Sequence, residues 1–307
     1  MRILAALLLL PLIACGDDDG TDTDAAVATD AGRRDMSADA DGGEEPDAAV
    51  TEDAGSDLGA PDPCAGDALC EDFESYADRT AVGDGDRFGP WRAVHRGGGA
   101  FDLDETRAVS GSHSLHVRIG DGDREGGRLF TDGDIPILAG GPTELHGRMM
   151  MYVGDNGHSV HWTWAGVLGP TMDGTPVAGL RSTYLFSSLR QDDANQFSSV
   201  VYINSDPAQD CWNRSDTPIP SGEWMCLQWS VDSEGRHIEV SRDGASPFLV
   251  VDETGQGCVG DVANDSPWYG PVIDQLYVGT WSFHPMTGPL EVWIDDVVVD
   301  TEPVACP

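Results

Sequence analysis

His113-Ser-Leu-His-Val-Arg-Ile119 alternates between polar and apolar residues, and this stretch decides the fold class. Leu115, Val117 and Ile119 fall on one side of an extended chain, which is the pattern of a half-buried β-strand. No segment of helical length shows a clean helical stripe. The same alternation predicts strands over 145–153, 197–203, 224–231, 237–241, 272–281 and 290–298. We therefore predict an all-β protein, a two-sheet antiparallel β-jelly-roll sandwich.

The first residues predict a lipoprotein signal peptide over 1–14. Arg2 precedes an apolar run that ends at Leu12-Ile13-Ala14, directly before Cys15. The run is shorter than the roughly 20 residues that a membrane span needs. An ordinary secretory signal with a chance cysteine is the alternative. We expect Cys15 to be lipidated and the protein to lie in the bacterial cell envelope, periplasmic or surface-exposed, with the lipid as its only contact with a membrane.

Composition divides the remainder into a linker over 15–63 and a β-jelly-roll domain over 64–307. The linker is rich in Asp, Glu, Ala and Gly and has no aromatic residue, so it cannot bury enough apolar surface to fold. Acidic runs such as Asp17-Asp18-Asp19 could bind calcium loosely, but a solvated spacer is the simpler interpretation. The domain is long enough for one large core, and we expect a monomer.

The charge of the chain excludes several functions. It holds 54 Asp and Glu against 17 basic residues, for a net charge of −37, and every basic residue is Arg. Without Lys there is no Schiff base and no P-loop, and so acidic a protein repels nucleic acid. A polyanionic substrate would need a local cluster of arginines. The charge also favours a bound divalent cation.

Seven cysteines divide into Cys15 and six in the domain, an even number in an oxidising compartment. We expect three disulfides, one of them Cys64–Cys70, and we expect Cys211 to stay near Cys226. A zinc site is the alternative, but the cysteines and histidines lack ligand spacing.

Known catalytic signatures such as HExxH and GxSxG are absent from the sequence. One acidic loop, Asp121-Gly-Asp-Arg-Glu-Gly126 with Asp132 further on, is similar to a calcium-binding loop. Its flanking segments are predicted strands rather than helices, and an acidic chain produces such a match easily by chance.

Three segments indicate a second calcium site. They are Cys70-Glu-Asp-Phe-Glu74, the turn Ser110-Gly-Ser-His-Ser-Leu115, and Val292-Trp-Ile-Asp-Asp-Val297. Alternation places Asp296 in an apolar row, where a carboxylate needs a strong partner. The three segments resemble those of calcium-bearing, carbohydrate-recognising jelly rolls, in which one Ca²⁺ ties the first and last strands to the turn. This resemblance implies ligands at Glu74, Ser110, His113 and Asp296, with Asp72 and Asp295 as substitutes.

Further motifs narrow the resemblance. They are Leu145-His-Gly-Arg-Met149, His158-Ser-Val-His161, Asp210-Cys-Trp212 and Trp224-Met-Cys226, followed by the terminal Cys306. In this order they resemble the family of the fungal cellulose-induced secreted protein and its bacterial relatives, over nearly all of 64–306. The family has a polysaccharide-lyase-like, concanavalin-like jelly-roll core related to glucuronan and heparin lyases. Gln228 departs from the pattern, because the resemblance leads us to expect Glu there.

The resemblance implies that the domain binds polysaccharide and leaves open whether it also cleaves uronate polymers by β-elimination. Such a lyase needs a group that neutralises the carboxylate, a base and an acid, for which Arg or Gln and His or Tyr are suited. We expect the candidates to line one concave sheet, although each could equally be an ordinary polar residue of a solvated face. The candidate catalytic residues are His158, His161, Arg181, Tyr184, Arg190 and Tyr202, and Gln196 is a candidate for substrate binding.

Tryptophans are the expected stacking surfaces for sugar rings, although a core role is as common for each of them. The candidates are Trp162, Trp164, Trp212 and Trp281. Two other functions stay open. The domain could be a non-catalytic carbohydrate-binding or adhesion module, or a structural envelope protein with no sugar site.

Overall fold

The computed structural model describes the domain and not the segments before it. The described residues are 64, 66, 68–76, 80–132, 135–159, 161–191, 194–203, 209–255, 257–259 and 267–307. The predicted signal peptide, Cys15 and the acidic linker therefore lie outside the described residues. Among the described residues, no helix is long and apolar enough to cross a lipid bilayer.

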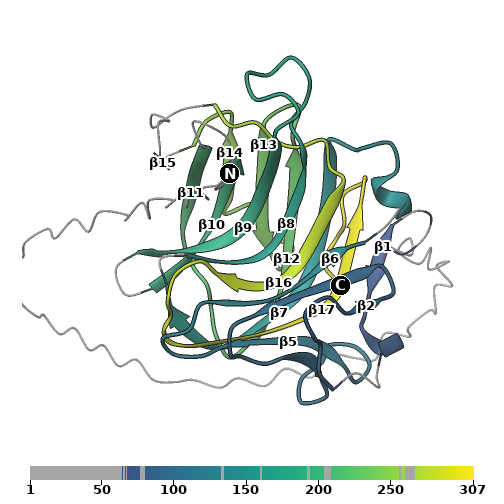
Figure 1. Cartoon of the computed structure of the whole chain (residues 1–307), viewed down its shortest axis with the longest axis vertical. Helices are drawn as coiled ribbons and strands as arrows, with labels where there is room; N and C mark the ends of the chain where they lie inside the picture. The colour runs from purple at the N-terminus through teal and green to yellow at the C-terminus, as the bar shows by residue number, and fades with distance from the viewer. Residues whose placement is uncertain are drawn as a thin grey trace, which may run out of the picture. The chain divides into compact units, whose positions relative to one another are not determined.

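An eight-stranded antiparallel sheet forms one layer of the domain (Figure 1). The first strand, β1, pairs with the last strand, β17, beside the β17–β5 pair. In spatial order the sheet contains β14 (Leu249–Asp252), β13 (His237–Arg242), β12 (Trp224–Asp232), β7 (Glu144–His158), β17 (Thr287–Asp300), β5 (Ser114–Ile119) and β4 (Phe101–Asp104), with β1 (Leu69–Glu71) on β17.

A nine-stranded antiparallel sheet forms the other layer. Two short 3₁₀ turns, η1 (Glu74–Tyr76) and η2 (Pro136–Leu138), are the helical elements of the described residues. In spatial order the sheet contains β15 (Gly257–Val259), β11 (Gln209–Pro218), β10 (Ala194–Ile203), β9 (Arg181–Gln191), β8 (His161–Pro170), β16 (Gln275–Ser282), β6 (Glu125–Thr131), β3 (Trp91–Arg96) and β2 (Arg87–Phe88). The predicted all-β, two-sheet jelly-roll sandwich is confirmed.

The core lies between the two sheets. Leu115, Val117 and Ile119 of the stretch that predicted the fold are all buried in it. Large aromatic side chains such as Trp91 and Trp164 are fully buried beside them. Each such side chain contributes roughly 1.5–3 kcal/mol through removal of apolar surface from water.

A β-bulge near the end of β17 changes which carboxylate is buried. The pairing of β17 with β7 shifts between Asp295 and Val298, and Asp296 has a positive φ of 47°. The extra residue reverses the alternation, so Val297 and Val299 face the core. Asp295 is fully buried, whereas Asp296 is only partly buried. The prediction that Asp296 lies in the apolar row is therefore wrong.

Disulfides fasten both ends of the domain. Cys64–Cys70 forms as predicted, and Cys226 on β12 bonds to Cys306. Cys211 is disulfide-bonded and lies opposite Cys258 in the pairing of β11 with β15. The expectation that Cys211 stays near Cys226 is wrong, because the two residues belong to different sheets. Such disulfides are typical of an extracellular or envelope protein.

Candidate functional site

The outer face of the nine-stranded sheet carries an apolar cluster of its own. Leu129 belongs to the core between the sheets, whereas Phe130, Tyr277, Leu185 and Val200 form a separate buried cluster. Neighbouring residues of a strand point to opposite sides of the sheet. The second cluster therefore lies on the face turned away from the core.

One arginine is set among the aromatic rings of this face. The guanidinium carbon of Arg128 lies 4.3 Å from the ring centre of Trp281 and 5.1 Å from those of Tyr277 and Phe130. We call these four residues the arginine–aromatic cluster. Arg128 Nε is buried without a hydrogen-bond partner, and no ion pair joins Arg128 to a carboxylate of the described residues. Burial lowers the pKa of Arg128, yet an arginine side chain stays charged in proteins.

Other polar groups of the same face are buried. Gln196 Oε1 has no hydrogen-bond partner among the described residues. The Tyr277 hydroxyl faces the side chains of Arg128 and Thr163, and burial raises the pKa of Tyr277. Thr163 pairs with Trp281 across β8 and β16, so it lies beside the cluster. Each unsatisfied buried group costs about 1–3 kcal/mol. A ligand or water that reached these groups would remove that cost.

His161 opens β8 on the same face. It pairs with Leu189, which in turn pairs with Gln196, so the three residues form one row across β8, β9 and β10. The His161 ring lies 4.9 Å from the ring of Phe283 and 5.3 Å from that of His284. Burial, and then the neighbouring His284, lower the pKa of His161 to about 4. The imidazole is therefore neutral at neutral pH and able to accept a proton.

The two predicted tyrosines lie on opposite sides of the nine-stranded sheet. Tyr202 is 41% exposed and points outward from β10. Tyr184 is fully buried, with its ring 5.1 Å from that of Trp268 and its hydroxyl 3.2 Å from Ser199 Oγ. Burial raises the pKa of Tyr184 further above its usual value. A catalytic role for Tyr184 is contradicted by this position, because no surface ligand reaches it.

The predicted histidine and arginine set is not brought together. His158 ends β7 in the eight-stranded sheet, so it does not share a sheet with His161. The Arg181 guanidinium donates two hydrogen bonds of 2.9 Å to Asp274 and is therefore already neutralised. The side chain of Arg190 lies outside the described residues.

The four predicted stacking tryptophans divide into two pairs. Trp162 and Trp164 are fully buried in the core, so their expected role in sugar stacking is wrong. Trp281 lies over Arg128, and Trp212 is partly buried against the outer apolar cluster. Of the predicted site residues, the outer face therefore gathers His161, Gln196, Tyr202, Trp212 and Trp281.

The three segments of the predicted calcium site do meet, but their oxygens are already hydrogen-bonded. Glu74 Oε1 accepts bonds of 2.7 and 2.6 Å from the backbone N–H groups of Ser112 and His113, and Glu74 Oε2 lies 3.2 Å from His113 Nδ1. The hydrogen bond from Ser112 N–H is the main cause that lowers the pKa of Glu74 to about 2. Ser110 Oγ donates to Asp296 Oδ1 over 2.6 Å.

The buried Asp295 replaces Asp296 as the anchor of this corner. It accepts hydrogen bonds from the backbone N–H groups of Val109 (2.7 Å), Ser110 (3.3 Å) and Asp296 (2.8 Å). Burial nevertheless raises the pKa of Asp295 to about 6. These bonds join the turn to the last strand without a metal.

An arginine lines the same corner. A cavity of about 230 Å³ is bordered by Asp72, Ser110, Asp296 and Arg148, and Arg148 Nε and Nη1 are buried without a partner in the described part of the chain. No three His, Cys, Asp or Glu side chains of the described residues are placed to hold a metal. A buried cation also disfavours a divalent ion beside it. The residues as they lie do not make a calcium ligand set, and calcium binding stays a prediction.

In the acidic loop after β5, the first and last carboxylates, Asp121 and Asp132, contact different parts of the chain. Asp121 Oδ1 accepts a 2.7 Å hydrogen bond from Gly288 N–H, whereas Asp132 forms an ion pair with Arg87. The two carboxylates that would close a calcium loop are therefore bound to different parts of the chain. This arrangement does not support the calcium-loop alternative.

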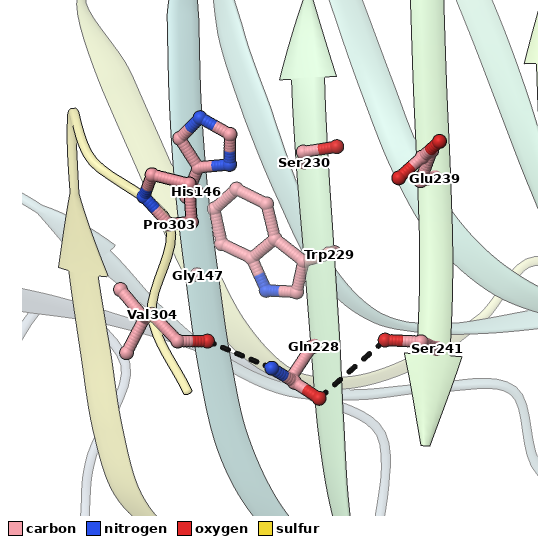
Figure 2. A pocket seen from close by; sticks show the side chains of 9 residues that line it. All are labelled: His146, Gly147, Gln228, Trp229, Ser230, Glu239, Ser241, Pro303 and Val304. Carbon is pink, nitrogen blue, oxygen red and sulfur yellow. Dashed lines mark hydrogen bonds between the residues drawn. The ribbon is translucent and has the colours of Figure 1, made fainter. Parts of the chain in front are cut away.

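Gln228, which departs from the family pattern, lies on the other sheet. Figure 2 shows its amide between the C-terminal segment and β13. Gln228 Nε2 donates a 2.8 Å hydrogen bond to the Val304 carbonyl, and Gln228 Oε1 accepts a 3.5 Å bond from Ser241 Oγ. A glutamate could not donate to that carbonyl. The glutamine fits a structural role that fastens the C-terminal segment.

Arg128 is the residue that sequence reasoning missed. The sequence indicates this position in the stretch Arg128-Leu129-Phe130, because residues two apart in a strand lie on the same face and Arg128 therefore lies beside Phe130. The expected site was instead sought in the middle of the domain. The pairing of β6 with β16, far apart in sequence, is what places Arg128 beside Trp281.

Comparison with known proteins finds similarity in structure alone. No protein-family model and no curated protein matches the chain. A solved structure of the cellulose induced protein Cip1 is 21% identical, with a TM-score of 0.46 over 78% of this chain and 100% of that one. The endo-β-1,4-glucuronan lyase of the fungus Trichoderma reesei is 13% identical, with a TM-score of 0.45 over 69% and 91% of the two chains. A glycoside hydrolase family 16 endo-glucanase from Bacteroides ovatus is 10% identical, with a TM-score of 0.44 over 71% and 98%.

These similarities are similarities of fold. The structural likeness to the cellulose-induced protein and to a glucuronan lyase, expected from the sequence motifs, is found at low sequence identity.

Proposed function

We propose that the outer face of the nine-stranded sheet binds a polysaccharide that carries carboxylate groups. The observation that carries the proposal is Arg128, a largely buried cation that has no carboxylate partner among the described residues. A guanidinium can bind a carboxylate through two parallel hydrogen bonds, and this pairing is stronger where water is excluded.

The charge of the protein makes this arrangement informative. A chain with a net charge of −37 repels an acidic polymer at long range. Arg128 differs from the exposed arginines of the chain because its guanidinium is buried among aromatic rings, where water solvates it poorly. A local cation that stays unpaired supports selection for an anionic ligand at this point.

The aromatic rings supply the other half of sugar recognition. Trp281, Tyr277 and Phe130 surround the guanidinium, and Trp212 lies further along the same face. Pyranose rings have apolar faces that pack against such side chains. The combination favours an acidic polysaccharide over a simple anion. The predicted lipid anchor would hold this face at the cell envelope.

His161 favours a second candidate, cleavage of the bound polymer by β-elimination. With its pKa lowered to about 4, His161 is a neutral base on the same face. It would take the proton from C5 of a uronate while the C4–O bond breaks and a C4–C5 double bond forms. The leaving oxygen would take a proton from an acid or from water.

Retention and absorbance together test the proposal. The isolated domain is passed over immobilised polyuronate and immobilised neutral glucan, and soluble polyuronate is followed in the ultraviolet for unsaturated products. We expect retention on polyuronate, and Arg128→Gln should weaken it by about 2 kcal/mol, or roughly thirtyfold. Arg118→Gln, an exposed arginine of the eight-stranded sheet, is the matched control.

Each outcome decides between the candidates. Equal retention of the Arg128→Gln and Arg118→Gln variants would overturn the acidic-ligand proposal. Unsaturated products that disappear in His161→Ala would establish elimination. Retention without products would leave a binding module.

A further inference from the structure

A second cavity lies at one end of the sandwich, apart from the arginine–aromatic cluster. It has a volume of about 330 Å³ and is lined from both sheets. The eight-stranded sheet contributes the turn 233–236 between β12 and β13. The nine-stranded sheet contributes the loop 171–180 between β8 and β9, and Tyr269 lines the remaining wall.

The lining combines one cation, one anion and one aromatic ring. Arg236 and Glu234 both line the cavity, and neither has a side-chain partner among the described residues. Tyr269 is partly buried against the core. Ser233, which also lines the cavity, is fully buried, and its hydroxyl has no hydrogen-bond partner among the described residues. Donors and acceptors of hydrogen bonds are therefore both present and unused.

The walls of the cavity are held in place by backbone hydrogen bonds. In the loop, Gly179 N–H donates to the Thr171 carbonyl over 3.1 Å, and Leu180 N–H donates to Val177 over 3.0 Å. In the turn, Arg236 has a positive φ of 52° and its carbonyl accepts a 2.9 Å bond from Glu253 N–H. A cavity that is formed before binding costs its ligand less ordering entropy.

We infer that this cavity is a second saccharide site, which takes a single neutral pyranose unit. The volume is at the lower end of the range for small-molecule sites, about 300–1,000 Å³. Met172, Pro176 and Tyr269 offer apolar surface for a ring face. Arg236 donates and Glu234 accepts, which suits the hydroxyl groups around the ring rim.

The charge of the lining separates this ligand from that of the other site. The charges of Glu234 and Arg236 cancel, so the lining carries no net charge. A carboxylate-bearing unit would approach Arg236 only beside Glu234, in a protein that is already strongly acidic. The inference does not rest on the proposed function, because the two sites share no residue.

The experiment uses the isolated domain and short neutral oligosaccharides. β-1,4-linked glucose and xylose fragments of two to four units are titrated by calorimetry, and oligouronates of the same length are titrated in parallel. We expect neutral fragments to bind and to slow amide hydrogen exchange in 171–180 and 233–236. Arg236→Gln and Glu234→Gln should each weaken this binding about tenfold, which is the loss of one or two hydrogen bonds to a charged group.

Controls keep the two sites distinct. Arg124→Gln, an exposed arginine outside the cavity lining, should bind as the parent does, and Arg128→Gln should lose polyuronate while keeping the neutral fragment. Melting temperatures confirm that each variant is folded, and Glu234→Gln serves if Arg236→Gln does not fold. The inference is overturned if the parent binds no neutral fragment, if oligouronates protect the same segments better, or if both variants bind like the parent.

Discussion

The outer faces of the two sheets differ in how their polar groups are satisfied. On the eight-stranded sheet, His116 lies between Asp102 (2.9 Å) and Glu291 (3.0 Å), and Trp293 Nε1 donates to Asp104 over 2.6 Å. On the nine-stranded sheet, Arg128 Nε and Gln196 Oε1 are buried without a hydrogen-bond partner among the described residues.

This difference indicates which face has polar groups that can still form hydrogen bonds with a ligand. A side chain whose hydrogen bonds are made within the chain stabilises the fold and has little left for a ligand. A buried group without a partner costs stability and regains it when a ligand binds. Arg148 is an exception on the eight-stranded sheet, because two of its nitrogens have no partner among the described residues beside Asp72 and Asp296.

The largest expected effect on stability is that of Trp293→Phe. The substitution removes the indole N–H that Asp104 accepts and disturbs the stacked contact with His116, whose ring centre is 4.6 Å away. We expect a loss of about 2 kcal/mol in the free energy of unfolding, measured by denaturant titration. Trp212→Phe on the other face is the matched control and should cost less. An equal loss in both variants would remove the distinction between the faces.

Gln228→Glu should have the next largest effect on stability. The carboxylate cannot donate to the Val304 carbonyl, so the two oxygens repel each other. We expect a loss of about 1–2 kcal/mol in the free energy of unfolding and no change in polysaccharide retention. A gain of lyase activity in this variant would contradict the structural role assigned to Gln228.

Arg128→Met should act in the opposite direction. Methionine has a similar length and no charge, so it removes a buried cation that has no ion-pair partner among the described residues. We expect unfolding free energy to stay level or to rise by about 1 kcal/mol, while retention on polyuronate is lost. A large loss of stability would show that the cation–π contacts outweigh the cost of burial.

The pH dependence of stability tests His116 on the paired face. Burial lowers its pKa, but Asp102 and Glu291 outweigh that effect and raise the pKa above its usual value. The stabilisation is therefore full below about pH 6.5 and is lost as the pH rises through the folded pKa. We expect the free energy of unfolding to fall as the pH rises through that window in the parent, and this fall to be absent in His116→Asn. Asp295, with a pKa of about 6, titrates in both proteins and cancels in the comparison.

Removal of calcium should have the smallest effect on the stability of the domain. Because Arg148 already places a positive charge beside Asp296, we expect a chelator to shift the melting temperature by less than about 2 °C. A rise of several degrees on addition of millimolar calcium would show that the ion binds the folded domain. The melting temperature of Arg148→Gln, measured with and without calcium, distinguishes the effect of the Arg148 guanidinium from that of a bound calcium ion.

The sequence predicts the fold more fully than the site. Strands whose outward-facing residues are polar, such as β5 and β12, keep a regular alternation that is visible in the residues. The strand β8 is buried over most of both faces, so its residues do not show that alternation. The site depends on which strands become neighbours, and alternation within one strand does not say that β6 pairs with β16.

Local irregularities of the strands explain the other site features that the sequence does not predict. One positive φ at Asp296 exchanges the burial of Asp295 and Asp296, and no periodic pattern contains it. Tyr184 and Tyr202 are the same residue type on neighbouring strands, but Tyr184 faces the core and Tyr202 faces the solvent. The residue type alone does not predict this difference.

The disulfide at the start of the domain also decides how a pulling force would enter it. A pull on the chain before Cys64 crosses the Cys64–Cys70 bond directly and reaches β1 at Cys70, which is paired with Val298 of β17. The load then passes to Glu71, whose carboxylate accepts hydrogen bonds from Trp91 Nε1 (2.7 Å) and Phe73 N–H (2.8 Å). β17 lies inside the eight-stranded sheet, whereas β1 is a three-residue strand that pairs with β17 among the described strands. A domain held at its N-terminus while it binds a polymer would therefore be loaded first at the short β1–β17 pairing, and the hydrogen bonds of Glu71 add to the resistance of that pairing.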